Sequence, residues 1–251
     1  MATELRTARL AVLIDADNAS SRIADGLFEE IAKIGEASVR RIYGDFSGTR
    51  LKAWADILSK HAIIPHQNFA YTKGKNASDI ALVIDAMDLL HSGRFDGFCL
   101  VSSDSDFTRL AARLREQGAD VYGFGTQNTP ESFRQACRRF IYTENLLPEA
   151  PAPDRDPVAG GAALQPPSAA VPLLSKVIAR MADDDGEWVG LGGVGQRLGQ
   201  LAPDFDPRTY GHAKLGDLVE KTGAFEIDRS ERGVRVRLKP AAKPRAPRKK
   251  S

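Results

Sequence analysis

Aspartates follow two apolar stretches of this 251-residue chain at the points where those stretches end. Asp15 closes the run RLAVLID, and Asp104 and Asp106 follow the run FDGFCLVS with one residue between them. Asp79 stands near the start of a third apolar stretch, SDIALVIDAMDLL. Carboxylates that lie close together repel one another, so such a set is typical of a site that holds a cation. Mg²⁺ and Mn²⁺ are the ions that prefer carboxylate oxygens.

Each of these aspartates also has a purely structural interpretation. Aspartate commonly caps helix N-termini, where free backbone amides and the helix dipole favour a negative charge. Asp79, Asp104 and Asp106 stand at expected helix starts, and a cap explains any one of them alone equally well. Asp15 differs because it ends a buried strand. Asp85 follows Asp79 by six residues, about 9 Å further along the expected helix and on a different face, so we expect it at most to support the site.

The elements that would position these aspartates alternate between strand and helix patterns. Apolar runs typical of buried strands cover residues 9–15, 37–45, 95–102 and 119–125, and a run with a proline at 62–67 is typical of an edge or a strand end. Amphipathic patterns predict helices over residues 22–35, 50–61, 77–93 and 106–118. This alternation predicts an α/β domain with a mainly parallel sheet between helices. The aspartates should then converge at the carboxyl edge of the sheet.

A proline-rich segment divides the chain. Residues 148–172 hold seven of the fourteen prolines, which predicts an unfolded, semi-stiff linker after a first domain of residues 1–147. Residues 173–238 show three helix patterns, the last over residues 210–223, and then two alternating strands around a glycine-containing turn, which predicts a small winged helix-turn-helix domain. Residues 239–251 carry six basic side chains and no acidic one, so we expect a disordered tail that strengthens binding to phosphates or only aids solubility.

The composition excludes several classes of protein. A hydrophobic fraction of 42% and a charged fraction of 27% are ordinary for a soluble globular protein, and we expect neither a membrane span nor a secretion signal. Cys99 and Cys137 form no metal-binding or redox motif, which is typical of a reduced cytoplasmic protein. The motif GLGGVG at residues 190–195 has the spacing of a dinucleotide-binding loop. It follows the acidic ADDDGEW rather than a strand, so we expect no nucleotide site there.

Three stretches resemble the signature blocks of the NYN domain, a branch of the PIN-like nuclease superfamily. They are LAVLIDADNAS, KGKNASDIALVIDAMDLL and FDGFCLVSSDSDFTRLAARLREQGADVYGFG, and the resemblance covers most of residues 8–147. It implies a PIN-like fold and metal-dependent cleavage of RNA. It also implies that Asp15, Asp79, Asp104 and Asp106 form the catalytic, metal-binding cluster for Mg²⁺ or Mn²⁺. Asn18 matches the polar position just after the first strand.

Other polar residues near the aspartates are candidates for contact with RNA. Lys73 and Lys75, in the loop that leads to Asp79, would meet the RNA backbone as cations or remain ordinary solvated lysines. Ser102 and Ser103 would donate hydrogen bonds to a phosphate or only satisfy the turn after their strand. We therefore expect substrate contacts from Asn18, Lys75 and Ser103.

The second domain resembles the LOTUS domain, also called OST-HTH, and DPRTYGHAKLGDLVEKTGAFEI carries most of that resemblance. It implies binding of RNA or, in some members, of a protein partner. Tyr210 is a candidate for stacking on a base, whereas Phe225 is expected in the core. The candidate phosphate contacts are Arg208, Lys214, Arg229, Arg232, Arg235 and Arg237.

The leading interpretation is a cytoplasmic, divalent-metal-dependent ribonuclease with an attached RNA-binding module. One alternative is an NYN domain that binds RNA without cutting it, and such binding should survive removal of divalent ions. Another starts from DADNA, which resembles the first motif of haloacid-dehalogenase-type phosphatases. That family would require Thr or Val where this chain has Ala19, and the SSDSDF block suits it less well.

Overall fold

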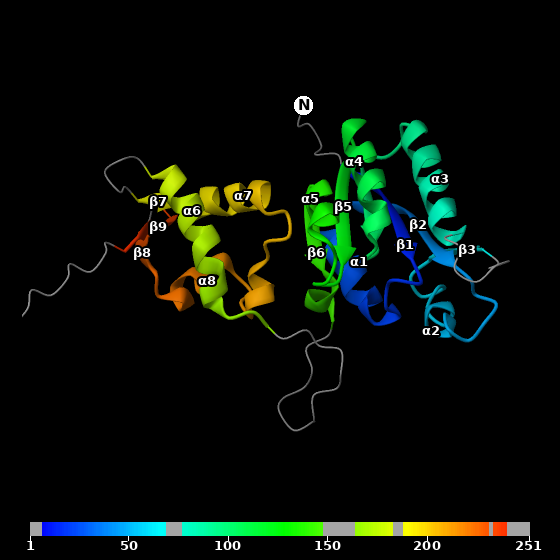
Figure 1. Ribbon diagram of the computed structural model, residues 1–251, viewed down its shortest axis with the longest axis horizontal. Coiled ribbons are helices and arrows are strands. Elements are labelled where there is room, and N and C mark those ends of the chain that lie inside the picture. Colours follow the sequence, from blue (N-terminus) through cyan, green and yellow to red (C-terminus); the bar gives the residue numbers. More distant parts are fainter. Residues whose placement is uncertain (1–6, 69–76, 148–163, 183–187, 231–232, 240–251) are drawn as a thin grey trace, which may run out of the picture. The chain divides into compact units, whose positions relative to one another are not determined.

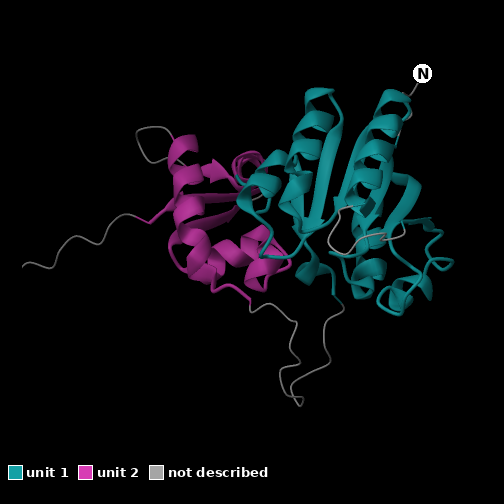
Figure 2. Cartoon of the chain, turned by 45° about the vertical axis from the view of Figure 1, so that its right-hand side comes forward, with its two compact units in different colours: residues 1–163, 202–205 teal, residues 164–201, 206–251 magenta. Residues whose placement is uncertain are grey.

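The computed structural model describes residues 7–68, 77–147, 164–182, 188–230 and 233–239. The chain forms two compact units, which are Met1–Ala163 with Ala202–Phe205 and Leu164–Leu201 with Asp206–Ser251 (Figure 2). Among the residues described, no helix is both long enough and apolar enough to cross a membrane.

The first unit is built on a six-stranded sheet in which every neighbouring pair of strands is parallel (Figure 1). The strands are β1 (Arg9–Asp15), β2 (Glu36–Gly44), β3 (Ile64–Gln67), β4 (Gly97–Val101), β5 (Asp120–Gly125) and β6 (Arg139–Tyr142). Their order is β3-β2-β1-β4-β5-β6, so β1 and β4 are the central pair. The fold predicted from sequence is confirmed, and β3 lies at the edge as its proline suggested.

Helices cover both faces of this sheet. One face carries α1 (Ala24–Ala32) and α2 (Lys52–Ala55), and the other carries α3 (Ala77–His91), α4 (Thr108–Glu116) and α5 (Glu131–Ala136). Because successive side chains of a strand point to opposite faces, β1 contributes to two apolar cores. Val12 and Ile14 pack with α1 and α2, whereas Leu13 packs with α3 and α4. Burial on both faces explains why β1 reads as a continuous apolar run.

Two parts of the first unit differ from the sequence prediction. The helix expected over residues 50–61 is helical only at Lys52–Ala55, and irregular turns follow it. Those turns still bring Ile57 and Leu58 against the apolar core, so the amphipathic spacing was satisfied without a continuous helix. No element was expected between residues 126 and 147, where the structure has α5 and β6.

The connection order places a topological switch between β1 and β4. From β1 the chain moves outward to β2 and β3, and after α3 it returns to add β4 on the other side of β1. The connections that leave β1 and β4 therefore run in opposite directions, and the carboxyl ends of strands at such a switch are where ligands of open α/β sheets bind. Asp15 is the last residue of β1, and Ser102 directly follows β4.

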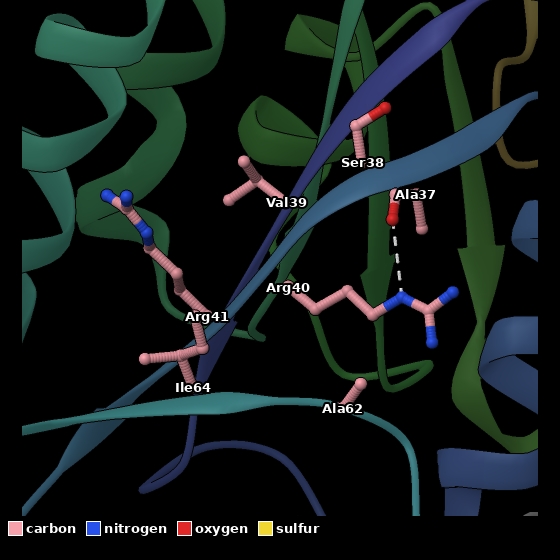
Figure 3. A pocket seen from close by; sticks show the side chains of 7 residues that line it. All are labelled: Ala37, Ser38, Val39, Arg40, Arg41, Ala62 and Ile64. Carbon is pink, nitrogen blue, oxygen red and sulfur yellow. Dashed lines mark hydrogen bonds between the residues drawn. The ribbon is translucent and has the colours of Figure 1, made fainter.

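The outer edge of β2 is only partly covered. β3 pairs with Arg41–Gly44, and on the side away from β1 no described strand pairs with Glu36–Arg40. Ser38 is an extra residue in the pairing with β1, because Leu10 pairs with Ala37 and Ala11 with Val39. Arg40 turns back along the strand, where its Nε donates to the Ala37 carbonyl at 3.3 Å (Figure 3). Its Nη1 donates to the His61 carbonyl at 2.8 Å. A groove of about 340 Å³ lies along this β2 edge.

In its described residues, the second unit has three α-helices and a three-stranded antiparallel sheet of order β7-β9-β8. Its elements are α6 (Val171–Met181), β7 (Val189–Gly190), α7 (Leu191–Leu201), α8 (Leu215–Thr222), β8 (Phe225–Ser230) and β9 (Gly233–Leu238). This arrangement of helices followed by an antiparallel hairpin agrees with the winged-helix prediction. Phe225 is 4% exposed, as expected for a core residue.

Three details of the second unit correct the sequence prediction. Residues 164–172, expected to be unfolded linker, contain a 3₁₀ turn at Pro167–Ala170 and the start of α6, and Ala170 is fully buried. The helix expected over 210–223 is restricted to α8, because Gly211 adopts a left-handed φ of 78° that interrupts it. The motif GLGGVG does follow a strand, β7, but β7 pairs antiparallel with β9 and so forms no βαβ unit.

Candidate active site

Asp15, Asp17, Asp79, Asp104 and Asp106 belong to the carboxyl edge of the sheet, which we call the acidic edge, and Asp15 is its buried member. Only 1% of the residue is exposed. Its Oδ2 accepts hydrogen bonds from Ser102 Oγ at 2.7 Å and Asn18 Nδ2 at 2.8 Å, and its Oδ1 accepts one from the Asp17 amide at 3.1 Å. Burial raises the pKa of Asp15, and these hydrogen bonds oppose the increase because they stabilise the ionised form.

The turn after β4 is tied to Asp15 through Ser102. The Ser102 hydroxyl accepts a hydrogen bond from the Asp104 amide at 3.0 Å while it donates to Asp15. The Asp104 carboxylate in turn accepts from the Asp106 amide at 2.9 Å and caps the 3₁₀ turn Ser105–Phe107. Asp104 is therefore a structural cap, as the simpler interpretation proposed, and it stands beside Asp15 as well.

Asp79 stands in the first turn of α3, and the negative charges of the other acids act on its carboxyl group. Its pKa is raised to about 6, first by burial and then by the negative charges of Asp15, Asp104, Asp17 and Asp106. A carboxyl group resists ionisation when other carboxylates lie close to it. The structure therefore brings the four predicted acids together at the carboxyl edge of the sheet, with Asp17 as a fifth.

The loop after β1 is held by the segment that follows β2. The Arg50 guanidinium forms an ion pair with the Asp17 carboxylate. The indole Nε1 of Trp54, in α2, donates to the Ala19 carbonyl at 2.9 Å, and Trp54 is 2% exposed. A cation thus stands at the acidic edge on a segment anchored by a buried tryptophan.

Asp85 belongs to a separate cluster. Its carboxylate accepts hydrogen bonds from the Arg41 guanidinium and the Tyr43 hydroxyl, both on β2. The imidazole of His66 lies against the Tyr43 ring with 4.9 Å between centroids. Burial and the nearby Asp85 charge raise the pKa of Tyr43, so its hydroxyl remains a donor. Asp85 attaches α3 to the sheet and makes no described contact with the acidic edge.

The predicted substrate contacts differ in their surroundings. Asn18 lies at the site and donates to Asp15. The Ser103 hydroxyl is engaged with Thr126, whose amide donates to it at 2.9 Å and whose hydroxyl lies 3.2 Å away, so Ser103 links the exits of β4 and β5. Lys73 and Lys75 lie outside the described residues.

The donor chemistry of the acidic edge fits a hard divalent cation. Its acidic groups are all carboxylates, and a cation would relieve their mutual repulsion, which adds to burial in raising the pKa of Asp79. Asp15 keeps acceptor capacity, because Oδ1 receives a single described hydrogen bond. Within the described residues, no three acidic, histidine or cysteine side chains are already placed as metal ligands. Ion binding therefore requires the carboxylates to draw closer together.

Three residues of the site carried weaker signals in the sequence. Ser102 was considered only as a phosphate donor or a turn residue, but the structure makes it the link between Asp15 and Asp104. Asp17 is visible in DADNA, one residue beyond Asp15, and its charge acts on Asp79. Arg50 is the first residue of the helix expected over residues 50–61, and its partner could not be read from the sequence because a loop sets its path.

The candidate phosphate contacts of the second unit are largely paired with acids. The ion pairs are Arg208–Asp206, Arg229–Glu220, Arg235–Asp228 and Arg237–Glu226. Trp188, which the sequence analysis did not single out, lies under Arg237, whose guanidinium carbon is 4.6 Å from the ring centroid. Arg232 lies outside the described residues.

Comparisons with known proteins agree with this architecture. The family model of the NYN domain matches residues 9–146, and that of the OST-HTH/LOTUS domain matches residues 165–237. A crystal structure of a protein of unknown function from Vibrio parahaemolyticus is similar, with 18% sequence identity and a TM-score of 0.46, over 56% of this chain and 94% of that one. No curated protein matches the chain. The chain belongs to the NYN domain family and carries an OST-HTH/LOTUS domain after its NYN domain.

Proposed function

We propose that this protein is a ribonuclease that uses Mg²⁺ or Mn²⁺ and that its OST-HTH/LOTUS domain binds RNA. The observation that carries the proposal is the convergence of carboxylates on Asp79 at the switch between β1 and β4, where burial and then the charges of these carboxylates raise the pKa of Asp79 to about 6. The NYN family, a branch of the PIN-like nucleases, supports the same chemistry.

Asp15, Asp79, Asp104 and Asp106 would hold the divalent ion. When bound, the ion lowers the pKa of a water molecule and stabilises negative charge on the scissile phosphate. Ser102 and Asn18 fix the Asp15 carboxylate through hydrogen bonds, so they set the direction of its remaining lone pairs. Asn18 and Lys75 are the residues that we propose for the substrate. Ser103 would donate a hydrogen bond to a phosphate from the turn after β4, where the Thr126 amide holds its hydroxyl oxygen.

Electrostatics explains why the substrate and the ion would bind together. The acidic edge repels a phosphate as long as its carboxylates are not neutralised. A divalent ion removes that repulsion and adds an attraction of its own. RNA binding at this edge should therefore depend on the ion, in contrast to binding at the OST-HTH/LOTUS domain.

Cleavage assays with the purified full-length protein test the proposal. Single-stranded and hairpin RNAs with an internal fluorophore would be incubated with Mn²⁺, Mg²⁺ or EDTA, beside the variants Asp104→Asn and Asp88→Asn. Asp88 is exposed on α3 and serves as a control for loss of one surface carboxylate. We expect cleavage only with a divalent ion, a loss of at least ~100-fold in Asp104→Asn, and normal activity in Asp88→Asn. Bound but intact RNA under every condition would instead support a non-catalytic RNA-binding protein.

We also propose a cytoplasmic location and an RNA partner for the second domain. Cys99 and Cys137 are free and buried, which fits a reducing compartment. A protein partner is the alternative for the OST-HTH/LOTUS domain, because the described arginines of its β8–β9 hairpin, which we call the wing, are already paired with acids. RNA binding by the full chain that persists in EDTA and in Asp104→Asn would support the RNA partner.

A further inference from the structure

Arg50 stands at the acidic edge of the first unit and is held there only loosely. Its side chain is 69% exposed, and its guanidinium pairs with Asp17, whose side chain is 27% exposed. An ion pair this exposed to solvent is weak, since water screens the attraction and the long side chain loses entropy when it is fixed. The guanidinium can therefore exchange Asp17 for another anion at little cost.

The backbone beneath Arg50 is fixed, in contrast to its guanidinium. Leu51, the next residue, is 4% exposed, and Trp54 is 2% exposed and donates from its indole to the Ala19 carbonyl at 2.9 Å. These contacts tie the start of α2 to the loop that leaves β1. The base of the Arg50 side chain is thus anchored next to the carboxylates, and only its end is free to reorient.

Arg50 and a divalent ion would act on the same group of charges. Asp17 lies two residues after Asp15, and its amide donates to the Asp15 carboxylate at 3.1 Å, so the charge that Arg50 partly neutralises stands beside the proposed ion site. A guanidinium fork binds a phosphate through two parallel hydrogen bonds, a geometry that a single exposed contact with one carboxylate oxygen does not provide.

We propose that Arg50 is a phosphate-binding residue that turns from Asp17 to the RNA strand when substrate enters the site. In the free protein its guanidinium neutralises Asp17. In the complex it binds a non-bridging phosphate oxygen of a nucleotide next to the scissile bond, and Asp17 becomes free to support the divalent ion. This inference rests on the proposed ribonuclease site and adds a specific contact with the substrate.

A purely structural role for Arg50 gives the opposite expectation. If the pair with Asp17 only fixed the loop after β1, its loss would loosen the acidic edge and weaken ion binding. If Arg50 competes with the ion, its loss strengthens ion binding. The sign of the change in Mn²⁺ affinity therefore separates the two roles.

The experiment compares the full-length wild-type protein with Arg50→Gln, Arg50→Lys and the control Lys52→Gln, an exposed cation two residues further on. Mn²⁺ affinity would be measured without RNA by electron paramagnetic resonance. Affinity for a short single-stranded RNA would be measured by fluorescence anisotropy at several salt concentrations, with Ca²⁺ in place of Mn²⁺. Circular dichroism would verify that each variant is folded.

For Arg50→Gln we expect Mn²⁺ binding about 2–5-fold tighter, RNA binding roughly 3–10-fold weaker, and a salt dependence lower by about one phosphate contact. Arg50→Lys should keep part of the RNA affinity, and Lys52→Gln should change neither affinity. Weaker Mn²⁺ binding, or an unchanged RNA affinity and salt dependence, in Arg50→Gln would overturn the inference. A wild-type protein that binds no Mn²⁺ would refute the metal site and the proposed exchange at Asp17, while the RNA measurements would still decide whether Arg50 contacts a phosphate.

Discussion

Ser102 donates its hydroxyl hydrogen to Oδ2 of Asp15 at 2.7 Å, and this bond joins the ends of the two central strands. Both residues are almost fully buried, at 2% and 1% exposure. We expect Ser102→Ala to lower the free energy of unfolding by about 1–3 kcal/mol, because a buried carboxylate loses a donor. It should also weaken Mn²⁺ binding, since the Asp15 carboxylate is less well fixed.

Urea denaturation and Mn²⁺ titration of Ser102→Ala check this prediction. Ser105→Ala, at an exposed position in the same turn, is the matched control and should resemble the wild type. Equal stabilities for the two variants would show that the hydrogen bond to Asp15 does not matter.

The carboxylates around Asp79 should make the ion-free protein less stable as the pH rises. The pKa of Asp79 is about 6 in the folded chain against an ordinary value of 3.8, so the folded state binds more protons than the unfolded state between these values. Asp79 therefore leaves the free energy of unfolding unchanged below about pH 4. It lowers this free energy progressively as the pH rises to about 6, and the loss remains at higher pH. A shift of about two units corresponds to ~3 kcal/mol, which solvent screening at a partly exposed group reduces to about 1–2 kcal/mol.

Asp79→Asn removes this repulsion, so in EDTA at pH 7.5 we expect a gain of about 1–2 kcal/mol in the free energy of unfolding that disappears near pH 4. In Mn²⁺ the wild type should be more stable than Asp79→Asn, because only the wild type has all the carboxylates that bind the ion and stabilise the folded state. Thermal denaturation at both pH values, with and without Mn²⁺, measures the four stabilities. A variant that is less stable than the wild type in EDTA at pH 7.5 would contradict the placement of Asp79 among the other acids.

The contacts of Asp85 should stabilise α3 against the sheet. Tyr43 is fully buried, and the side chains of Arg41 and Asp85 are 26% and 18% exposed, so solvent screens this cluster only partly. We expect Asp85→Ala to cost about 2–3 kcal/mol, because it leaves Arg41 without its carboxylate, and Tyr43→Phe to cost about 1 kcal/mol.

Guanidinium denaturation of both single variants and the double variant gives the coupling between Tyr43 and Asp85. A shared hydrogen bond predicts a coupling of at least ~0.5 kcal/mol. Strictly additive effects would mean that the tyrosine hydroxyl does not act through Asp85.

The acids of the wing should limit RNA binding by the second unit. Arg235 and Arg237 are paired with Asp228 and Glu226 on the neighbouring strand, so their positive charges are partly neutralised. The double variant Glu226→Gln, Asp228→Asn frees both guanidinium groups. We expect it to bind single-stranded RNA more tightly and with a steeper salt dependence, by about one or two phosphate contacts.

Fluorescence anisotropy at several salt concentrations measures this change, in EDTA so that the acidic edge does not contribute. Glu220→Gln offers a control, because it removes an exposed carboxylate of α8 and frees Arg229 while Arg235 and Arg237 keep their acidic partners. An unchanged affinity in the wing variant would argue that the wing does not face RNA.

The sequence predicted those parts of the structure that depend on local pattern. Arg9–Asp15 and Gly97–Val101 are strands because their side chains are buried on both faces, and burial leaves a continuous apolar run. Asp15 and Asp104 lie at one edge because parallel strands end together. The segment after Arg50 shows where an amphipathic pattern does not predict a helix. Its apolar residues are packed against the core by irregular turns, which satisfy the same spacing.

Contacts between loops could not be predicted in the same way. The bond from Ser102 to Asp15 and the pair of Arg50 with Asp17 depend on the path of each loop and on the side-chain rotamers, neither of which has a periodic signal. The contact of Trp188 with Arg237 could not be predicted for a similar reason, because it depends on where the arginine of β9 lies relative to the residue before β7. The spacing of acids along the chain indicated where charge would gather, but not which polar groups would hold it.

The open edge of β2 has a consequence for how this protein tolerates high concentration. A row of unpaired backbone groups at a sheet edge is a template on which another chain can add a strand, the first step of many aggregation processes. The extra residue Ser38 breaks the regular spacing of that row, and Arg40 covers the Ala37 carbonyl with its own guanidinium. Both features make it harder for a strand of another chain to pair with β2 along Glu36–Arg40, the part of the edge that β3 is too short to cover.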